Sequence, residues 1–217
     1  MAQMTFSLLV LYLTILAGLI GTIEARSRAR AYLEAQCRST LYPDLCVRTL
    51  LPHANKYDLP SPQKIAQISL TTCLAKARFT KAYVNMVAKE LNKTKNPGEY
   101  EALEECLYQI NNGVNQITQS VKELQEMGKD GEEKFGWHES NVQSWVGAAL
   151  TDATACMDGF LGDKIGSKTK SMIKTRFLNV KELASNSLAL LNRYTSRHRA
   201  SRAIKNPYIN VIVDVLC

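Results

Sequence analysis

The sequence predicts an all-α protein: an antiparallel up-down four-helix bundle with an N-terminal helical hairpin and two disulfides. Three observations predict it. Four long stretches repeat apolar residues at spacings of three and four, short loops separate them, and six cysteines follow an apolar N-terminal segment. The spacing places apolar side chains on one stripe of each helix. Such stripes require partner helices, because burial of each aliphatic side chain is worth roughly 1.5–3 kcal/mol.

The N-terminal segment, residues 1–25, is expected to be a secretory signal peptide. Phe6–Ile20 is a short, uncharged apolar run, and polar residues resume at Glu24. Cleavage is expected between Gly21 and Ala25, and an uncleaved membrane anchor is the alternative. No other segment is long and apolar enough to span a bilayer, so no membrane contact is expected after cleavage.

Residues 31–51 are expected to form two short helices that fold back on each other. Pro43 disfavours helical geometry at Tyr42 and suits the first turn of the helix that follows. Cys37 and Cys46 lie on either side of this turn. Since secreted proteins favour disulfides, we expect a bridge between these two cysteines to close the hairpin.

Four amphipathic stretches are expected to form the bundle. The second has the most regular stripe, with apolar residues at alternating spacings of four and three between Leu103 and Leu124. Ser61 is expected to cap the first helix, and the polar segment Gly128–Gly136 is expected to be the loop before the third. Together with the hairpin they give a predicted domain over residues 26–195, followed by a basic tail over residues 196–217. The four predicted helices are Pro62–Leu91, Glu99–Met127, His138–Phe160 and Lys168–Tyr194.

Bundle geometry favours one further disulfide. Cys106 lies near the start of the second predicted helix and Cys156 near the end of the third, so antiparallel packing places them level. Cys73 is offset from Cys106 by about a dozen residues, roughly 18 Å along a helix. We therefore expect a Cys106–Cys156 bridge and a buried free thiol at Cys73. Cys217 is expected to be free or to form an intermolecular bridge.

The net charge of +7 is compatible with nucleic acid, an anionic membrane or an acidic extracellular polymer. The sequence contains no nucleic-acid-binding motif and lacks the interleaved aromatic residues of single-strand binders, so no nucleic-acid partner is expected. The sequon Asn92-Lys-Thr94 predicts a glycan on Asn92, at the end of a predicted helix.

No catalytic residues are expected. His53, His138 and His198 have no carboxylate or thiol at a spacing that indicates catalysis. The sequence also lacks a phosphate-binding glycine loop and a zinc motif, so neither a cofactor nor a metal ion is expected. These observations predict a secreted protein that acts by binding and is not an enzyme.

Several segments resemble the plant invertase and pectin methylesterase inhibitor family. The segment from Cys37 to Cys46 is similar to the family's opening pattern, Cys-x-x-Thr-x-Tyr-Pro-x-x-Cys. The resemblance extends over roughly residues 30–195. It implies a four-helix bundle with the two disulfides expected above, in a monomeric protein of the cell wall (apoplast) that inhibits a carbohydrate-active enzyme in a one-to-one complex. The other similar segments are Ala102–Leu107, Trp145–Thr151, Cys156–Phe160 and Ser185–Leu190.

The resemblance leaves the target enzyme open. Invertase inhibitors of the family carry a Pro-Lys-Phe motif in a bundle loop, whereas this chain has Glu133-Lys-Phe135 without the proline. This difference favours pectin methylesterase as the partner, with cell-wall or vacuolar invertase as the alternative. A pectin methylesterase pro-region is a third possibility, although no catalytic domain is expected in a chain of this length. The rival class is a module whose basic face binds pectate without an enzyme partner.

The expected mechanism is steric occlusion of the pectin-binding cleft by one face of the bundle. The family commonly has threonine before its fourth cysteine, at a position of esterase contact, and this chain has Ala155 there. A lost hydroxyl would weaken the complex by about 0.5–1.5 kcal/mol. The candidate contact residues are Tyr108, Thr151, Thr154 and Asp158.

Overall fold

The computed structural model describes residues 11–15, 27–54, 59–93, 97–129, 131–159 and 167–205. Within the helices, the side chains at 92, 93, 97–99, 101, 102, 132, 167 and 205 are outside this description. The described regular structure is entirely helical, and the predicted all-α class is confirmed. After short helices over residues 11–15 and 27–37, the elements are α2 (Pro43–Leu50), η1 (Leu51–His53), α3 (Pro62–Lys93), α4 (Pro97–Glu126), α5 (Glu132–Gly159) and α6 (Ser167–Lys205).

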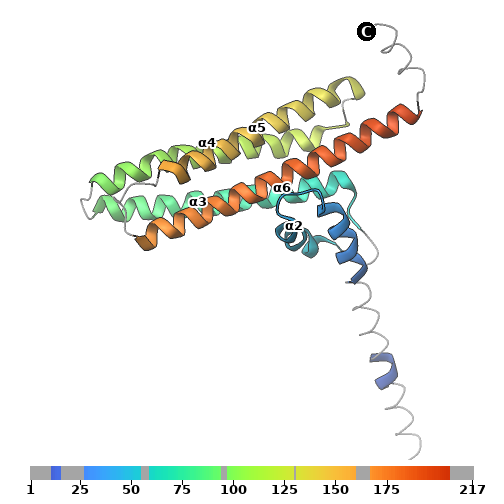
Figure 1. Ribbon diagram of the computed structural model, residues 1–217, viewed down its shortest axis with the longest axis horizontal. Coiled ribbons are helices and arrows are strands. Elements are labelled where there is room, and N and C mark those ends of the chain that lie inside the picture. Colours follow the sequence, from blue (N-terminus) through green and yellow to red (C-terminus); the bar gives the residue numbers. More distant parts are fainter. Residues whose placement is uncertain are drawn as a thin grey trace, which may run out of the picture.

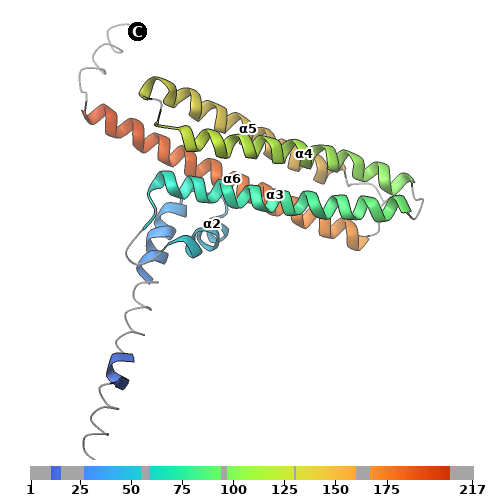
Figure 2. The ribbon, with the colours of Figure 1, turned by 180° about the vertical axis from the view of Figure 1, so that it is seen from behind.

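The four long helices form the predicted antiparallel bundle. Helix α3 packs against α4 and α6, and α5 packs against the same two helices. Figures 1 and 2 show that α4 and α5 form one layer of the bundle and that α3 and α6 form the other. The N-terminal hairpin lies against α3 and α6, because α2 contacts both of them. The outer surface of the α4–α5 layer is therefore left free of the hairpin.

The core follows the predicted stripes. On α4, Leu103, Ile110, Ile117 and Leu124 are at most 3% exposed, and the intervening aliphatic positions are buried or half-buried. To the same core α6 contributes the fully buried Phe177. Each of the four long helices contributes one buried stripe to a common core. Two of the helices alone could not bury their stripes, so the bundle needs all four.

Helix α5 begins earlier than the sequence analysis predicts. The segment Gly128–Gly136 was expected to be a loop, but α5 starts at Glu132. Gly128 and Gly131 have positive φ angles of 87° and 83°, so the turn is confined to the residues before Glu132. Phe135 is 4% exposed and packs edge-on against Tyr194 with ring centroids 5.9 Å apart. Burial of this aromatic ring favours the helical extension that positions it.

Helix α6 ends later than predicted, at Lys205 and not at Tyr194. The added turns pack against the early part of α5. The His198 ring stacks on Phe135 with centroids 4.0 Å apart, and Arg199 Nη1 donates a hydrogen bond to Glu139 Oε2 at 2.5 Å. Polar and basic residues dominate this segment, so its contacts were not visible as an apolar stripe.

Both predicted disulfides are confirmed. Cys37 and Cys46 are bridged with Cα atoms 5.8 Å apart, and Cys106 and Cys156 are bridged with Cα atoms 4.7 Å apart. Cys73 is a buried free cysteine, also as expected. Cys217 lies outside the described residues.

Cys73 should be chemically inert in the folded protein. Burial raises the pKa of its thiol to about 12, so the reactive thiolate is scarce at pH 8. In a Cys217→Ser background, which removes the sixth cysteine of the chain, we expect no reaction with a thiol reagent under native conditions. One thiol per chain should react after unfolding in denaturant. Rapid modification of the native protein would contradict this prediction.

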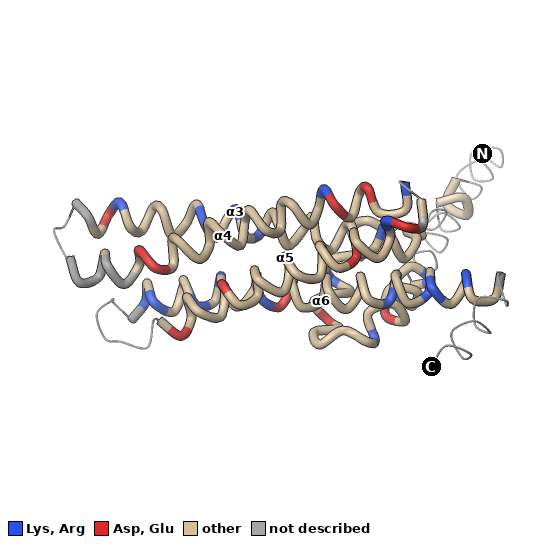
Figure 3. The backbone as a smooth tube through the Cα atoms, turned by 90° about the horizontal axis from the view of Figure 1, so that it is seen from above, with Lys and Arg blue, Asp and Glu red and all other residues tan. Residues whose placement is uncertain are grey.

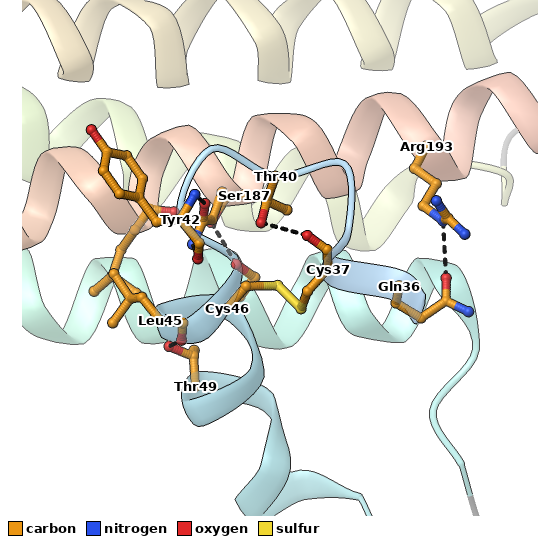
Figure 4. The surroundings of a disulfide bond; sticks show 12 residues. Gln36, Cys37, Thr40, Tyr42, Leu45, Cys46, Thr49, Ser187 and Arg193 are labelled. Atoms are coloured by element: carbon orange, nitrogen blue, oxygen red, sulfur yellow. Dashed lines mark hydrogen bonds between the residues drawn. A yellow bond between two sulfur atoms is a disulfide. The ribbon is translucent and has the colours of Figure 1, made fainter. Parts of the chain in front are cut away.

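The hairpin is fixed on α6 by a buried side chain. Asn186 is 1% exposed; its Oδ1 accepts a hydrogen bond from Tyr42 N at 3.1 Å, and its Nδ2 donates to Tyr42 O at 2.8 Å. Figure 4 shows Tyr42 beside the disulfide that closes the hairpin. A side-chain amide that satisfies both backbone groups of one residue leaves little freedom for the hairpin to move.

Candidate target-binding site

Two contacts fix the register of α4 against α5. The Cys106–Cys156 disulfide joins the helices at one point, and a Cβ atom added at Gly113 would lie 3.9 Å from the Cβ of Ala149. Because the helices are antiparallel, seven steps along α4 correspond to seven steps back along α5. The same register places Tyr108 level with Thr154. These predicted contact residues therefore belong to one cross-section of the bundle.

A shallow hollow lies on the outer side of α5, near its end. Its volume is about 390 Å³, and it is lined by Leu150, Thr151, Thr154, Ala155 and Asp158. The structure thus brings three of the four predicted contact residues together. Thr154 follows Thr151 by three residues, and Asp158 follows Thr154 by four, so all three lie on one face of the helix.

The polar groups of this hollow are partly committed. Thr151 Oγ1 donates to Gly147 O at 3.3 Å, and Thr154 Oγ1 donates to Leu150 O at 2.9 Å. Both hydroxyl oxygens can still accept a hydrogen bond from a partner, because a hydroxyl has two acceptor lone pairs. Asp158 is exposed in the last turn of α5. The hollow therefore offers acceptors and suits a partner that presents hydrogen-bond donors.

Tyr108 does not line the hollow. Its side chain is 61% exposed on α4. An exposed tyrosine has a large apolar ring and a polar hydroxyl, a combination that is common at protein interfaces. It extends the candidate site from α5 onto α4.

Sequence reasoning missed Asp152, which lies between two hollow residues in the chain. Its side chain is half-buried, and its Oδ2 has no hydrogen-bond partner among the described residues. Burial raises the pKa of this carboxyl group. Its spacing of three from Ala149 and four from Cys156, both buried, is the signal by which it could have been found.

Asp152→Asn should stabilise the protein at neutral pH. Burial favours the neutral acid in the folded state and so raises its pKa. The contribution of Asp152 to the free energy of unfolding is therefore highest below the unfolded pKa of about 3.9 and is lost as pH rises through the raised folded pKa. Urea unfolding at pH 7 should give a higher midpoint for the variant than for the wild type, and the gain should shrink towards pH 3.5. The matched change Glu104→Gln, at an exposed position of α4, should alter neither midpoint. Equal stability of Asp152→Asn and wild type at pH 7 would contradict the prediction.

His138 and His198 make contacts between helices. None of the three histidines has a carboxylate or thiol at a spacing in the sequence that indicates catalysis, but the fold brings the carboxylate of Glu123 to His138. Its Nδ1 lies 2.8 Å from Glu123 Oε1, and Asn141 Nδ2 donates to the same oxygen at 2.9 Å. The partner was missed because it lies on α4, across the turn from α5. His53 is exposed in η1.

In the part of the chain that the structure describes, no group of three or more His, Cys, Asp or Glu side chains is arranged to hold a metal ion. None of the described helices combines the length and apolar character needed to cross a membrane. Asn92 lies in the last turn of α3, but its side chain and Thr94 are outside the described part of the structure.

The fold defines the class of protein as an antiparallel four-helix bundle with two disulfides. A family model, Plant invertase/pectin methylesterase inhibitor, matches residues 31–190. The chain belongs to this family, and with it to a class of inhibitors that are not enzymes.

Comparisons with individual proteins agree with this assignment. Pectinesterase inhibitor 9 of Arabidopsis thaliana is 38% identical over 93% of this chain and 97% of its own length. Pectinesterase inhibitor 11 of the same plant is 32% identical over 91% of this chain and all of its own length. The crystal structure of a mutant form of a pectin methylesterase inhibitor from Arabidopsis shares the fold, with a TM-score of 0.57 at 17% identity over 74% of this chain and 95% of that chain.

Proposed function

We propose that this protein inhibits a pectin methylesterase by forming a one-to-one complex in which the outer face of α4 and α5 covers the pectin-binding cleft. The observation that carries the proposal is the hollow on α5, where Thr151, Thr154 and Asp158 lie together beside the disulfide-linked Cys156. The names of the relatives, which are pectinesterase inhibitors, support the choice of enzyme. The protein would act as a monomer that excludes the polymer sterically.

The rigidity of the α4–α5 layer suits this mechanism. A surface that is already ordered loses less conformational entropy on binding than a flexible one. Here a disulfide joins the two helices, and the small residues Gly113 and Ala149 allow them to approach closely. Exposed Tyr108 would supply an anchoring side chain for the partner, since tyrosine is frequent among residues that dominate binding energy.

Secretion is part of the same proposal. We propose that residues 1–25 direct the chain to the extracellular space and are removed, and that Asn92 carries a glycan. A protein of the cell wall would meet both the esterase and its substrate there. Intact-mass measurement of the secreted chain, with and without glycosidase treatment, would test both statements.

Titration against two enzymes tests the target. The chain, secreted by an oxidising host, should inhibit a plant pectin methylesterase in proportion to its concentration, with an equivalence point at one inhibitor per enzyme. A cell-wall invertase should keep its full rate in a parallel titration. Inhibition of invertase alone would overturn the choice of target, and silence against several isoforms of both enzymes would overturn an inhibitory function.

Ala155→Thr should tighten the complex. Ala155 lines the hollow at the position where the family commonly has threonine. A new hydroxyl that bonds to the esterase would contribute about 0.5–1.5 kcal/mol, or roughly 2–10-fold in the inhibition constant. Valine has the shape of threonine but no hydroxyl group. Ala155→Val therefore adds the same volume as Ala155→Thr without a hydrogen-bond donor and serves as the control. Equal effects of Thr and Val would remove the hydrogen bond from the explanation.

A further inference from the structure

Two arginine side chains of α6 meet the N-terminal hairpin at Gln36, and a third arginine, Arg38, lies two residues further along the hairpin. Arg193 Nε donates to Gln36 Oε1 at 3.1 Å, and Arg197 Nη1 donates to the same oxygen at 3.4 Å (Figure 4 shows the first of these bonds). Arg38 lies in the hairpin turn. Burial lowers the pKa of Arg193, and the charges of Arg197 and Arg38 lower it further. We call Arg38, Arg193 and Arg197 the arginine cluster.

The arginine cluster contains no carboxylate. Among the described residues, ion pairs neutralise other arginines, such as Arg199 with Glu139, but none involves a member of the cluster. The shared acceptor, Gln36, is neutral and 6% exposed. Three like charges around a neutral amide repel one another, so an anion that binds between them would relieve the repulsion.

The cluster is also held in place. Gln36 and Arg38 flank Cys37, whose disulfide to Cys46 fixes the hairpin turn. The buried contact of Asn186 with the hairpin then sets the position of this turn on α6. Arg38 and Arg197 are exposed and Arg193 is half-buried, so the charges are both positioned and accessible.

The cluster lies apart from the candidate inhibitory face. The hairpin covers the α3–α6 layer, whereas the hollow belongs to α5 in the opposite layer. In Figure 3, lysine and arginine positions recur along the last turns of α6. One molecule could therefore bind an enzyme through α5 and an anion through the cluster at the same time.

We propose that the arginine cluster binds carboxylate groups of an acidic polysaccharide, in particular a stretch of polygalacturonate without methyl esters. A planar guanidinium group binds a carboxylate through two parallel hydrogen bonds, and three such groups suit a polymer that repeats one carboxylate per sugar. The choice of polymer rests on the proposed function, because this polymer is what a pectin methylesterase produces. The cluster would retain the inhibitor on pectin that has already been de-esterified.

Binding to polygalacturonate in the absence of any enzyme tests the proposal. At 0.15 M salt the full secreted chain should bind polygalacturonate and not highly methyl-esterified pectin. The double variant Arg38→Gln/Arg197→Gln, which keeps the half-buried Arg193, should bind about tenfold more weakly. The control Lys89→Gln/Lys168→Gln removes the same charge at exposed positions elsewhere, and it should change binding less than twofold, because charges beyond about 8 Å are screened at this salt concentration.

Three outcomes would overturn the arginine site. They are no binding of the wild type at 0.15 M salt, equal weakening in both double variants, and equal binding of esterified and de-esterified polymer. Thermal unfolding of each variant verifies that it is folded, and Arg38→Lys alone, which keeps the charge, should lose less than Arg38→Gln. Esterase inhibition is measured separately, so a chain that inhibits without binding the polymer refutes only this site.

Discussion

Replacing Cys106 and Cys156 by serine should lower the free energy of unfolding by about 4 kcal/mol, because their disulfide closes a loop with a sequence separation of 50 residues. Domains of ordinary size have only about 5–15 kcal/mol of stability in total. Both positions are at most 1% exposed, so the two new hydroxyl groups would also have to find hydrogen-bond partners in the core. This is the largest stability effect that we expect from any single contact.

The hairpin disulfide provides a matched comparison. Cys37→Ser/Cys46→Ser removes the same chemistry from a loop of sequence separation 9, and the same entropy relation gives about 2.5 kcal/mol. Urea unfolding of both double variants should therefore rank the α4–α5 disulfide above the hairpin disulfide. Equal losses, or the reverse order, would show that loop entropy does not dominate the contribution of these bridges.

The functional consequence should differ between the two bridges as well. Without the Cys106–Cys156 bridge, α5 can shift along α4. Such a shift would change the position of Tyr108 on α4 relative to the hollow on α5. Esterase inhibition by this variant should weaken even at temperatures where circular dichroism shows it to be folded. Loss of the hairpin bridge leaves the α4–α5 layer intact and should change inhibition much less.

The parts of the fold predicted from sequence are those that depend on periodicity and on antiparallel geometry. The stripe from Leu103 to Leu124 determines which face of α4 is buried, because a spacing of three and four fits one helical face and no strand. The pairing of Cys106 with Cys156 followed from the same geometry, since adjacent antiparallel helices place only certain positions level. Both inferences rest on regular helix geometry, and neither depends on one particular contact between two polar or aromatic side chains.

The two helix ends that were predicted wrongly depend on contacts between single side chains of different helices. The start of α5 was missed because Phe135 is a single apolar residue among glycines and charges, and its burial depends on Tyr194 and His198 from α6. The end of α6 was missed for the same reason, because Arg199 is held by Glu139 from another helix. Such pairwise contacts leave no periodic trace in the sequence.

The candidate site shows the same division. Thr151, Thr154 and Asp158 share one hollow because their spacing alone places them on one helical face. The incomplete hydrogen bonding of Asp152 could not be predicted, since it depends on which atoms of other helices surround that carboxylate. The pairing of His138 with Glu123 across helices was likewise invisible before the register of α4 and α5 was known.

Thr154→Arg should reduce inhibition of pectin methylesterase by about 100-fold or more, the largest functional effect that we expect from one substitution. Thr154 lies in the hollow, level with Tyr108, at the centre of the proposed contact surface. A guanidinium group there would fill the hollow and would lie within reach of Asp158, four residues later on the helix. It would therefore both occupy the contact volume and take up an acceptor that the esterase would use, and central interface positions are the most sensitive to such changes. The inhibition constant is measured by titration against the esterase at constant pH.

Thr175→Arg is the matched control, because the two threonines make the same hydrogen bond within their helices, although Thr175 is exposed and Thr154 is half-buried. Each donates its hydroxyl to the carbonyl oxygen four residues earlier at 2.9 Å, Thr154 to Leu150 and Thr175 to Ser171. Thr175 instead lines a hollow between α3 and α6, in the layer away from the proposed contact. Both variants gain the same charge and size, and substitutions at such accessible positions usually change stability by only about 0.5 kcal/mol. If Thr175→Arg lost inhibition as strongly as Thr154→Arg, added charge would explain the loss, and the α5 hollow would no longer be supported as the contact surface.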